Sequence, residues 1–195
     1  LRLEWQEQRS TAEGKLFFST TGRVEARVGS GLLRQEHYLT YQILQGELDS
    51  LRIAMEGPGE ILDVQGADLV SWKVVSDSDE KHLEVVLSKP FKETSEFLVR
   101  SQTALGSFPL EVEGMSLVPE QAIRHSGFLR VSNVGSVRIE PTATTGLSQL
   151  APEQFPGEAL QSRQVYVYRF PSAKHGFSVV ADRIQPEVNV SEVIR

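Results

Sequence analysis

Apolar and polar residues alternate with a period of two along most of the chain, which is typical of strands that bury one face. In residues 48–56, for example, Leu51 and Ile53 share one face of the predicted strand. The same alternation predicts strands at 69–75, 82–88 and 94–100, and in weaker form at 23–28, 36–44, 128–132, 135–139, 163–170, 176–181 and 187–194.

Short segments rich in Gly, Pro, Asp and Ser separate these strands and predict turns, because Gly supplies positive φ and Pro fixes φ. Strands that alternate in this way need one covered face and one wet face, which antiparallel sheets provide. Helix is expected only as a turn or two, at 119–123 and at 147–155, where Pro152 interrupts the pattern. We therefore expect an all-β fold, an elongated antiparallel β-sandwich with very little helix. A smaller C-terminal sheet is a further option.

The segment 143–162 is the best candidate for a linker or a long crossover, because Pro152 and Pro156 lie in it among Gly, Gln and Ser. It would divide a main β-sandwich unit, residues 1–142, from C-terminal strands at 163–195. These strands belong to the same domain or begin a second unit. The chain starts at Leu1 and ends on an alternating pattern, so we expect a piece of a longer polypeptide.

Charge and composition exclude several classes of protein. The 195 residues include 20 Lys and Arg against 26 Asp and Glu, which gives a formal charge of −6. The basic residues are scattered, so nucleic-acid binding is not expected. No apolar run reaches the ~18–20 residues that span a bilayer, so this chain is not expected to insert into a membrane. The absence of Cys excludes disulfides and thiolate sites, while the cell compartment stays open.

Motifs for catalysis or cofactor binding are missing. His37, His82, His125 and His175 are spread along the chain without an HExxH or HxH pair, so we expect them at the surface or at strand edges. The sequence has no GxSxG elbow and no glycine-rich phosphate loop. Carboxylate pairs of the glycosidase kind meet only in three dimensions, so the many acidic residues decide nothing. We predict no catalytic residue and no cofactor.

The acidic run at Asp77, Asp79 and Glu80 is a candidate metal site, because hard oxygen ligands alternate there as they do in calcium loops. The run lacks the Gly at position 6 and the Glu at position 12 of an EF-hand. It lies between two predicted strands, so a solvated hairpin loop is favoured over a calcium site.

Aromatic residues share one face of the strand at 163–170, where Tyr166, Tyr168 and Phe170 alternate with valines on the other face. A flat aromatic row can stack against sugar rings, or it can pack across strands in a core. Apolar residues on both faces favour the core. A carbohydrate-binding interpretation would use Tyr166, Tyr168 and Trp5 as its platform.

Residues 39–103 carry a resemblance to known proteins. The motifs are a TY-x-I strand in "LTYQILQGELDSLRIAMEGPGEILDVQGADLVSWKVV", a Gly-ended strand and a Trp strand in the same run, and L-x-[VL]-x-L-x-x-P in "HLEVVLSKPFKETSEFLVRSQT". The pattern resembles β-rich, repeat-like units of large bacterial envelope-associated proteins. It is also similar to the N-terminal β-saddle domain of M1-type aminopeptidases, without their catalytic helical domain. The resemblance implies a scaffold or recognition module and transfers no catalytic residues.

Together these features predict a non-enzymatic structural or protein-interaction module of a larger bacterial protein. Its expected partners are neighbouring domains of the parent chain or another protein, through sheet faces or exposed strand edges. The periplasm or cell surface is favoured, although the compartment stays open. One alternative is a carbohydrate-binding module, with a glycan as partner. A second alternative is a hydrolase whose site is assembled from strand ends.

Overall fold

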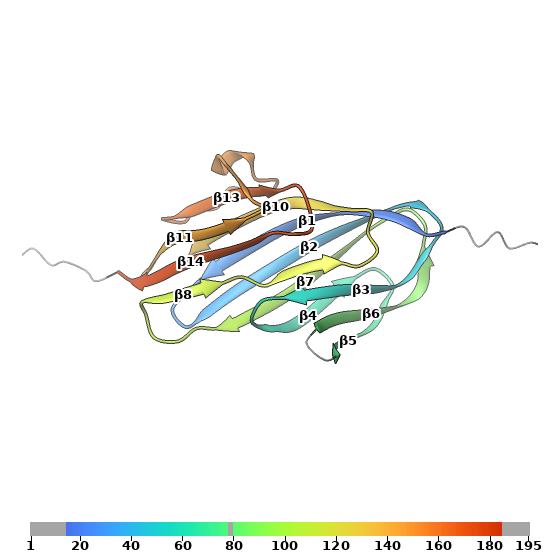
Figure 1. Ribbon diagram of the computed structural model, residues 1–195, viewed down its shortest axis with the longest axis horizontal. Coiled ribbons are helices and arrows are strands. Elements are labelled where there is room, and N and C mark those ends of the chain that lie inside the picture. The colour runs from blue at the N-terminus through green and yellow to red at the C-terminus, as the bar shows by residue number, and fades with distance from the viewer. Residues whose placement is uncertain (1–14, 78–79, 185–195) are drawn as a thin grey trace, which may run out of the picture.

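The computed structural model describes residues 15–77 and 80–184. Over these residues the chain forms three sheets and one short 3-10 helix, η1, so the expected all-β sandwich with very little helix is confirmed (Figure 1). No helix of the described part is long and apolar enough to cross a membrane. The strands are β1 (Phe17–Val28), β2 (Leu32–Gln45), β3 (Leu48–Glu56), β4 (Glu60–Gly66), β5 (Leu69–Asp77), β6 (Glu80–Phe91), β7 (Thr94–Ala104), β8 (Leu110–Glu113), β9 (Ser116–Pro119), β10 (Arg124–Asn133), β11 (Val137–Thr145), β12 (Ser148–Leu150), β13 (Val165–Phe170) and β14 (Gly176–Arg183), and η1 is Pro152–Gln154.

A seven-stranded sheet, in the order β12-β13-β10-β1-β2-β7-β4, forms one layer of the sandwich. A four-stranded sheet, β5-β6-β3-β9, and a three-stranded sheet, β11-β14-β8, pack on the same face of it (Figure 1). β8 and β9 follow each other directly in the chain and belong to different small sheets, so residues 114 and 115 join those sheets.

The pairing of β1 with β10 is parallel, whereas every other strand pair in the described part is antiparallel. The sequence pattern predicts antiparallel sheets, because alternating strands need one covered and one wet face, but alternation does not record strand direction and therefore misses this parallel pair. In this parallel register Gly22 lies opposite Gly127. A Cβ atom on Gly127 would lie 1.8 Å from the carbonyl oxygen of Gly22, so the close approach of the two strands requires glycine.

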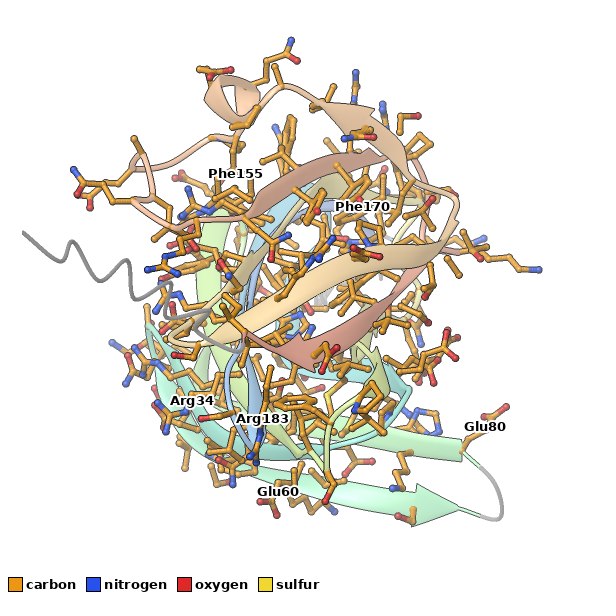
Figure 2. The ribbon with its side chains drawn as sticks, turned by 90° about the vertical axis from the view of Figure 1, so that its left-hand side faces the viewer. Arg34, Glu60, Glu80, Phe155, Phe170 and Arg183 are labelled. Atoms are coloured by element: carbon orange, nitrogen blue, oxygen red, sulfur yellow. The ribbon has the colours of Figure 1, made fainter. Side chains whose placement is uncertain are left out.

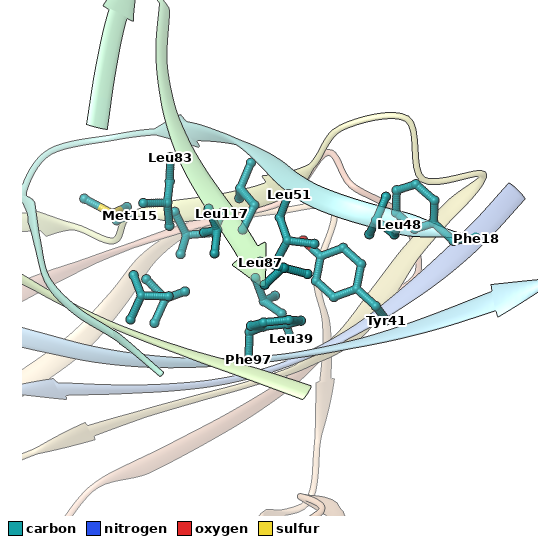
Figure 3. Packing of buried hydrophobic residues seen from close by; sticks show 14 residues of the cluster. Phe18, Leu39, Tyr41, Leu48, Leu51, Leu83, Leu87, Phe97, Met115 and Leu117 are labelled. Carbon is teal, nitrogen blue, oxygen red and sulfur yellow. The ribbon is translucent and has the colours of Figure 1, made fainter. Parts of the chain in front are cut away.

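The first core cluster fills the space between the seven-stranded and the four-stranded sheet. Figure 3 shows Leu51 and Leu83 of the small sheet facing Leu39, Tyr41 and Phe97 of the large sheet. The rings of Tyr41 and Phe97 meet edge to face with centroids 5.7 Å apart. Burial of these alternating apolar side chains, at about 25 cal/mol per Å², is the main stabilising term here.

The second core cluster lies between the seven-stranded and the three-stranded sheet. Its large-sheet side includes Val24, Leu129 and Tyr168, and its small-sheet side includes Ile139 and Val179. These residues are apolar positions at alternate places along their strands, so the period-two pattern accounts for this core as well as for the first.

The crossover from β11 to β13 covers part of the outer face of the seven-stranded sheet. It contains β12 and η1, and its Phe155 is buried. The guanidinium of Arg130 lies 4.2 Å from the centre of the Phe155 ring, and its Nη1 donates to the carbonyl of Glu158 at 2.6 Å. The crossover therefore covers the outer face of β10 around Arg130, whereas Arg124 of β10 and Arg169 of β13 stay exposed.

Some local expectations differ from the structure. Residues 119–123 form a turn instead of a helix, because Gln121 takes a positive φ of 63°. The segment 147–155 divides into β12 and η1. In the strand predicted at 69–75, Val70 lies outside the core and is 61% exposed, because the register is irregular between Leu69 and Ser71. The strand expected at 187–194 lies outside the described residues.

Candidate functional site

The aromatic row of β13 lies inside the sandwich. The register with β10 places Tyr166, Tyr168 and Phe170 on the core face of the large sheet, opposite residues 127–131. Tyr168 and Phe170 are buried, and Tyr166 is half-buried. The Tyr166 hydroxyl donates to the carbonyl of Ile139 at 3.3 Å. The row is thus cross-strand packing against the three-stranded sheet, as favoured from the sequence.

The other predicted site residues lie apart from this row. Trp5 and Asp79 are outside the described residues. Asp77 ends β5 and pairs with Glu80 at the start of β6. The Glu80 side chain is exposed and projects from the end of the β5–β6 hairpin (Figure 2), where it lies 3.6 Å from Nε2 of His82. Among the described residues no three His, Asp or Glu side chains are placed to hold a metal ion, and the calcium hypothesis stays a prediction.

A group of polar side chains lies in the interior where the two small sheets meet over the large sheet. Side chains of β1, β2, β7, β9 and β10 contribute to it, together with the residue that precedes β14. We name this set the polar seam: Thr20, Gln35, His37, Ser101, Ser116, His125 and His175. All of its members are buried except His175, which is half-buried.

Gln35 fastens the link between the two small sheets to the large sheet. Its Nε2 donates to the carbonyl of Met115 at 3.0 Å, and the backbone N–H of Met115 donates to its Oε1 at 2.7 Å. Both bonds are buried, so they satisfy the carbonyl and the N–H of Met115 at a place where water cannot serve as a partner. The amide of Gln35 thereby replaces a strand partner for Met115.

Two histidines of the seam are held by hydroxyl groups on neighbouring strands. His125 Nδ1 lies 2.8 Å from Oγ1 of Thr20, which is its register partner across the parallel β1–β10 pair. His37 Nε2 lies 3.5 Å from Oγ of Ser101 on β7. These contacts fix the orientation of both rings in the core.

His175 reaches the seam from the loop that joins β13 to β14. Its Nδ1 donates to the carbonyl of Ala173 at 2.9 Å, since a carbonyl can only accept. Its ring stacks on Phe170 with centroids 3.9 Å apart and planes 6° from parallel. The ring centre of His125 lies 6.0 Å from that of His175 and 5.3 Å from that of Phe170.

Burial keeps these imidazoles neutral. A cavity of about 10 Å³, which has room for about one water molecule, is lined by all three rings. Burial, together with the nearby His175 and His125, lowers the pKa of His37 to about 3. Burial and then His175 lower the pKa of His125 to about 4. The pKa of His175 is lowered by burial, against the opposing effect of the Ala173 and Ser172 carbonyls and Glu56.

The arrangement can take up protons, but it offers no open place for a substrate. Neutral imidazoles in a small closed cavity do not meet the requirement that a general base lie within hydrogen-bond reach of a reacting group. What the seam can do chemically is change its charge as the pH falls.

A ladder of charged side chains crosses the outer face of the seven-stranded sheet. At its β10 end Arg130 Nη2 donates to Oε2 of Glu25 at 2.7 Å, with exposed side-chain fractions of 7% and 9%. From there alternating charges continue to Arg27, Glu36, Arg100 and Asp63. A hollow of about 690 Å³ lies beside the ladder, and apolar Leu62, Val134 and Leu160 line it together with charged residues. Since most of these charges are paired, the hollow is not expected to favour a ligand of one sign of charge over the other.

A second charged group lies on the four-stranded sheet. Nδ1 of the buried His82 lies 2.5 Å from Oε1 of Glu120, and Nε of Arg52 lies 3.3 Å from Oε2 of the same carboxylate. A hollow of about 490 Å³ beside it is lined by residues that include Glu56, Glu80, His82 and Glu120. Glu120 thus contacts side chains of two neighbouring strands, Arg52 of β3 and His82 of β6, which stabilises the turn after β9.

The polar seam could not be found from the sequence. Its histidines lie far apart in the chain, and the contact between Thr20 and His125 spans 105 residues. We expected the histidines at the surface or at strand edges, but His37, His82 and His125 are buried, so that expectation was wrong for these three. The sequence did contain one signal of burial. His37 lies on the same face of β2 as Leu33, Gln35 and Leu39, at every second position, and all of these residues are buried.

Comparison with known proteins places the fold among enzyme chains. No family model matches the sequence, and no curated protein matches it. Native leukotriene A4 hydrolase from Saccharomyces cerevisiae matches over 91% of this chain and 32% of its own, with TM-scores of 0.50 and identities of 8% and 6% in two structures. An M1 zinc metallopeptidase variant from Deinococcus radiodurans, bound to a Tyr-Ser-Ala substrate, matches over 84% of this chain and 42% of its own, with a TM-score of 0.48 and 14% identity.

These matches correct the expected function. The non-enzymatic structural or interaction module, with its carbohydrate-binding and strand-end hydrolase alternatives, was predicted from a meander pattern and from missing motifs. The fold is instead shared with part of enzyme chains, of which this chain spans about a third in the yeast hydrolase. The solved structures that resemble it include M1 metallopeptidases, as one of the two resemblances implies. The envelope-associated, repeat-like units find no support in these matches.

Proposed function

We propose that this chain is the β-sheet part of a metallopeptidase-type enzyme. The observation that carries the proposal is the match of its three sheets, over 91% of the chain, to part of leukotriene A4 hydrolase from yeast. The identity of 8% supports a common fold, and the enzymatic context is our inference from it.

In this proposal the catalytic metal and its ligands belong to a part of the enzyme outside these 195 residues. The histidines described here have other surroundings. His37, His125 and His175 face a closed interior, and His82 faces Glu120. The partner of the chain is therefore the remaining part of the same enzyme.

The β5–β6 hairpin is our candidate for the surface that contacts that part. Two of the large apolar side chains exposed in the described residues, Val70 and Val86, lie close together on this hairpin, because Val86 is the register partner of Ser71. Exposed apolar side chains that gather in one place mark interaction surfaces more often than single ones do. β5 is also an edge strand, with backbone groups free to pair on one side.

The test begins with the gene that encodes the chain. We expect its reading frame to encode a zinc-binding HExxH motif beyond the present residues. The whole product should bind about one zinc ion and hydrolyse alanine p-nitroanilide. A matched product, in which alanine replaces the glutamate of that motif, should keep the zinc and lose the hydrolysis.

Two results would overturn the proposal. One is a reading frame without any zinc-binding motif, and the other is a whole product that contains the motif but binds no zinc.

A binding experiment tests the contact surface, with this chain and the remaining part of the enzyme expressed separately. The substitutions Val70→Asp and Val86→Asp should weaken the association of the two parts. The substitution Leu44→Asp, on β2, should leave the association unchanged.

A further inference from the structure

The polar seam divides the interior of the sandwich into two halves. Its cavity is lined on one side by Leu39, Met115 and Leu117 of the first core cluster, and on the other by Leu129 and Phe177 of the second. The four-stranded and the three-stranded sheet are therefore held to the large sheet by separate apolar clusters, with polar groups between them.

We propose that the polar seam is an acid-sensitive joint, at which protonation of its histidines releases the three-stranded sheet from the rest of the sandwich. This inference goes beyond the proposed function and does not depend on it. It rests on three imidazoles gathered around one closed cavity and on the strands to which they are attached.

The loop from β13 to β14 is the mechanical connection. Phe170 is the last residue of β13, in the large sheet, and His175 directly precedes β14, the central strand of the three-stranded sheet. Their stacked rings hold the start of β14 against the large sheet. Next to β8, Gly114 lies against the Phe177 ring, and its N–H donates to the Phe177 carbonyl at 3.2 Å. Loss of the stack would therefore loosen β14 and β8 together.

Charge on the seam acts against this connection. One proton on His175 is compatible with the stack, because an aromatic face attracts a cation. A second proton on His125 places a like charge with its ring centre 6.0 Å away, and because His125 is buried, water screens this repulsion less than it would at the surface. Protonation of His37 adds a third charge in a fully buried position.

Few charged groups are placed to offset these protons. Thr20, Gln35, Ser101 and Ser116 face the imidazoles from β1, β2, β7 and β9, and none of them carries a charge. Glu56, at the end of β3, is the acidic group that raises the pKa of His175. The adjacent Arg124 and Lys174 are cations and are exposed. One carboxylate thus acts on His175, and no carboxylate of the described residues lowers the cost of charging His37 or His125.

The direction of the response follows from the pKa values. Burial lowers the pKa of His37 to about 3 and that of His125 to about 4. Released from the seam, each ring would titrate near its ordinary value of 6.5. The released state therefore binds more protons between these limits, so it gains population as the pH falls.

The experiment follows backbone amide NMR signals of the 195-residue chain from pH 7.5 to pH 3.5. Signals of β14, β11 and β8 should leave their native positions at a higher pH than those of β3 and β6. Trp72, on the four-stranded side, should keep its native fluorescence through this first step when measured in a Trp5→Phe background.

Variants separate the seam from general acid unfolding. His125→Gln keeps a polar group near Thr20 but cannot be protonated, so the β14 midpoint should fall by about one pH unit. His175→Gln should act in the same direction. His82→Gln is the matched control, because His82 lies in the four-stranded sheet, and it should leave the β14 midpoint unchanged.

The proposal is overturned if β14 and β3 lose their signals at the same pH, or if the midpoint is the same in the wild type and in both seam variants. If His125→Gln does not fold at pH 7.5, His175→Gln decides the matter, because its side chain is only half-buried.

Discussion

Phe170 fills the space above the glycine pair that joins β1 to β10, since a Cβ atom on Gly127 would lie 2.7 Å from its ring. The ring of His175 stacks against the same Phe170 ring. One side chain therefore contacts the parallel strand pair and the loop into the three-stranded sheet. The absence of a side chain at Gly127 is as necessary to this packing as the presence of the ring.

Gly127→Ala should lower the free energy of unfolding by about 2–4 kcal/mol, because the new methyl group meets the backbone of Gly22 at 1.8 Å and neither strand can yield freely. Chemical denaturation measures the change. Gly106→Ala is the matched control, since nothing lies within 4 Å of its Cβ position, and it should be close to neutral. Equal effects of the two substitutions would contradict the packing described here.

Gln35→Leu should lower the free energy of unfolding by about 2–4 kcal/mol. The substitution leaves the N–H and the carbonyl of Met115 buried without partners, at a cost of about 1–3 kcal/mol each. Gln102→Leu serves as the control, because its bond to Glu60 is exposed. A cost for Gln35→Leu no larger than that of the control would show that Met115 is not held by this amide.

Arg130→Met should lower the free energy of unfolding by about 3 kcal/mol, because it leaves the carboxylate of Glu25 poorly solvated and beside fewer cations. The double variant with Glu25→Leu should recover part of this loss, since it removes the isolated charge. Lys92→Met breaks only the exposed pair with Glu47 and should have almost no effect. Thermal unfolding of the wild type, of the single variants Arg130→Met and Glu25→Leu and of the double variant tests the cycle, and additive losses would argue against a coupled pair.

Stability should fall as the medium is acidified from about pH 6.5 towards pH 3. The pKa of His37 is about 3 in the folded chain and 6.5 in its ordinary state, so the unfolded chain binds more protons between these values. Each such histidine then costs on the order of 1 kcal/mol per pH unit. Urea unfolding at a series of pH values should show this slope. It should be smaller in His37→Gln, and an unchanged slope would mean that His37 is not the group responsible.

The sequence predicts the positions of the strands far better than it predicts which strands pair with one another. Alternation is a local property, so β3 and β13 could be located from their own residues, including the face to which Tyr168 belongs. β8 and β9 have four residues each, too few for a period of two to stand out. The parallel pair of β1 and β10 depends on partners about a hundred residues apart, for which one strand's pattern gives no signal.

The seam was missed for the same reason. His37 and His125 each occupy a core position of an alternating strand, where a polar residue looks like an error in the pattern. Only the register of β1 with both β2 and β10 brings these two histidines together. A polar residue in phase with buried neighbours is thus the one local sign that such a site exists, and it does not identify the partner.

The parallel pair also sets an order of assembly during synthesis. β1 can pair with β2 as soon as residue 45 is available, but its other edge has to wait for β10, residues 124–133. Contacts of such long sequence separation form slowly, and an unpaired strand edge is a template for other chains. The chain is therefore most exposed to aggregation while residues 46–133 are being made, and a chaperone that shields β1 would act in that interval.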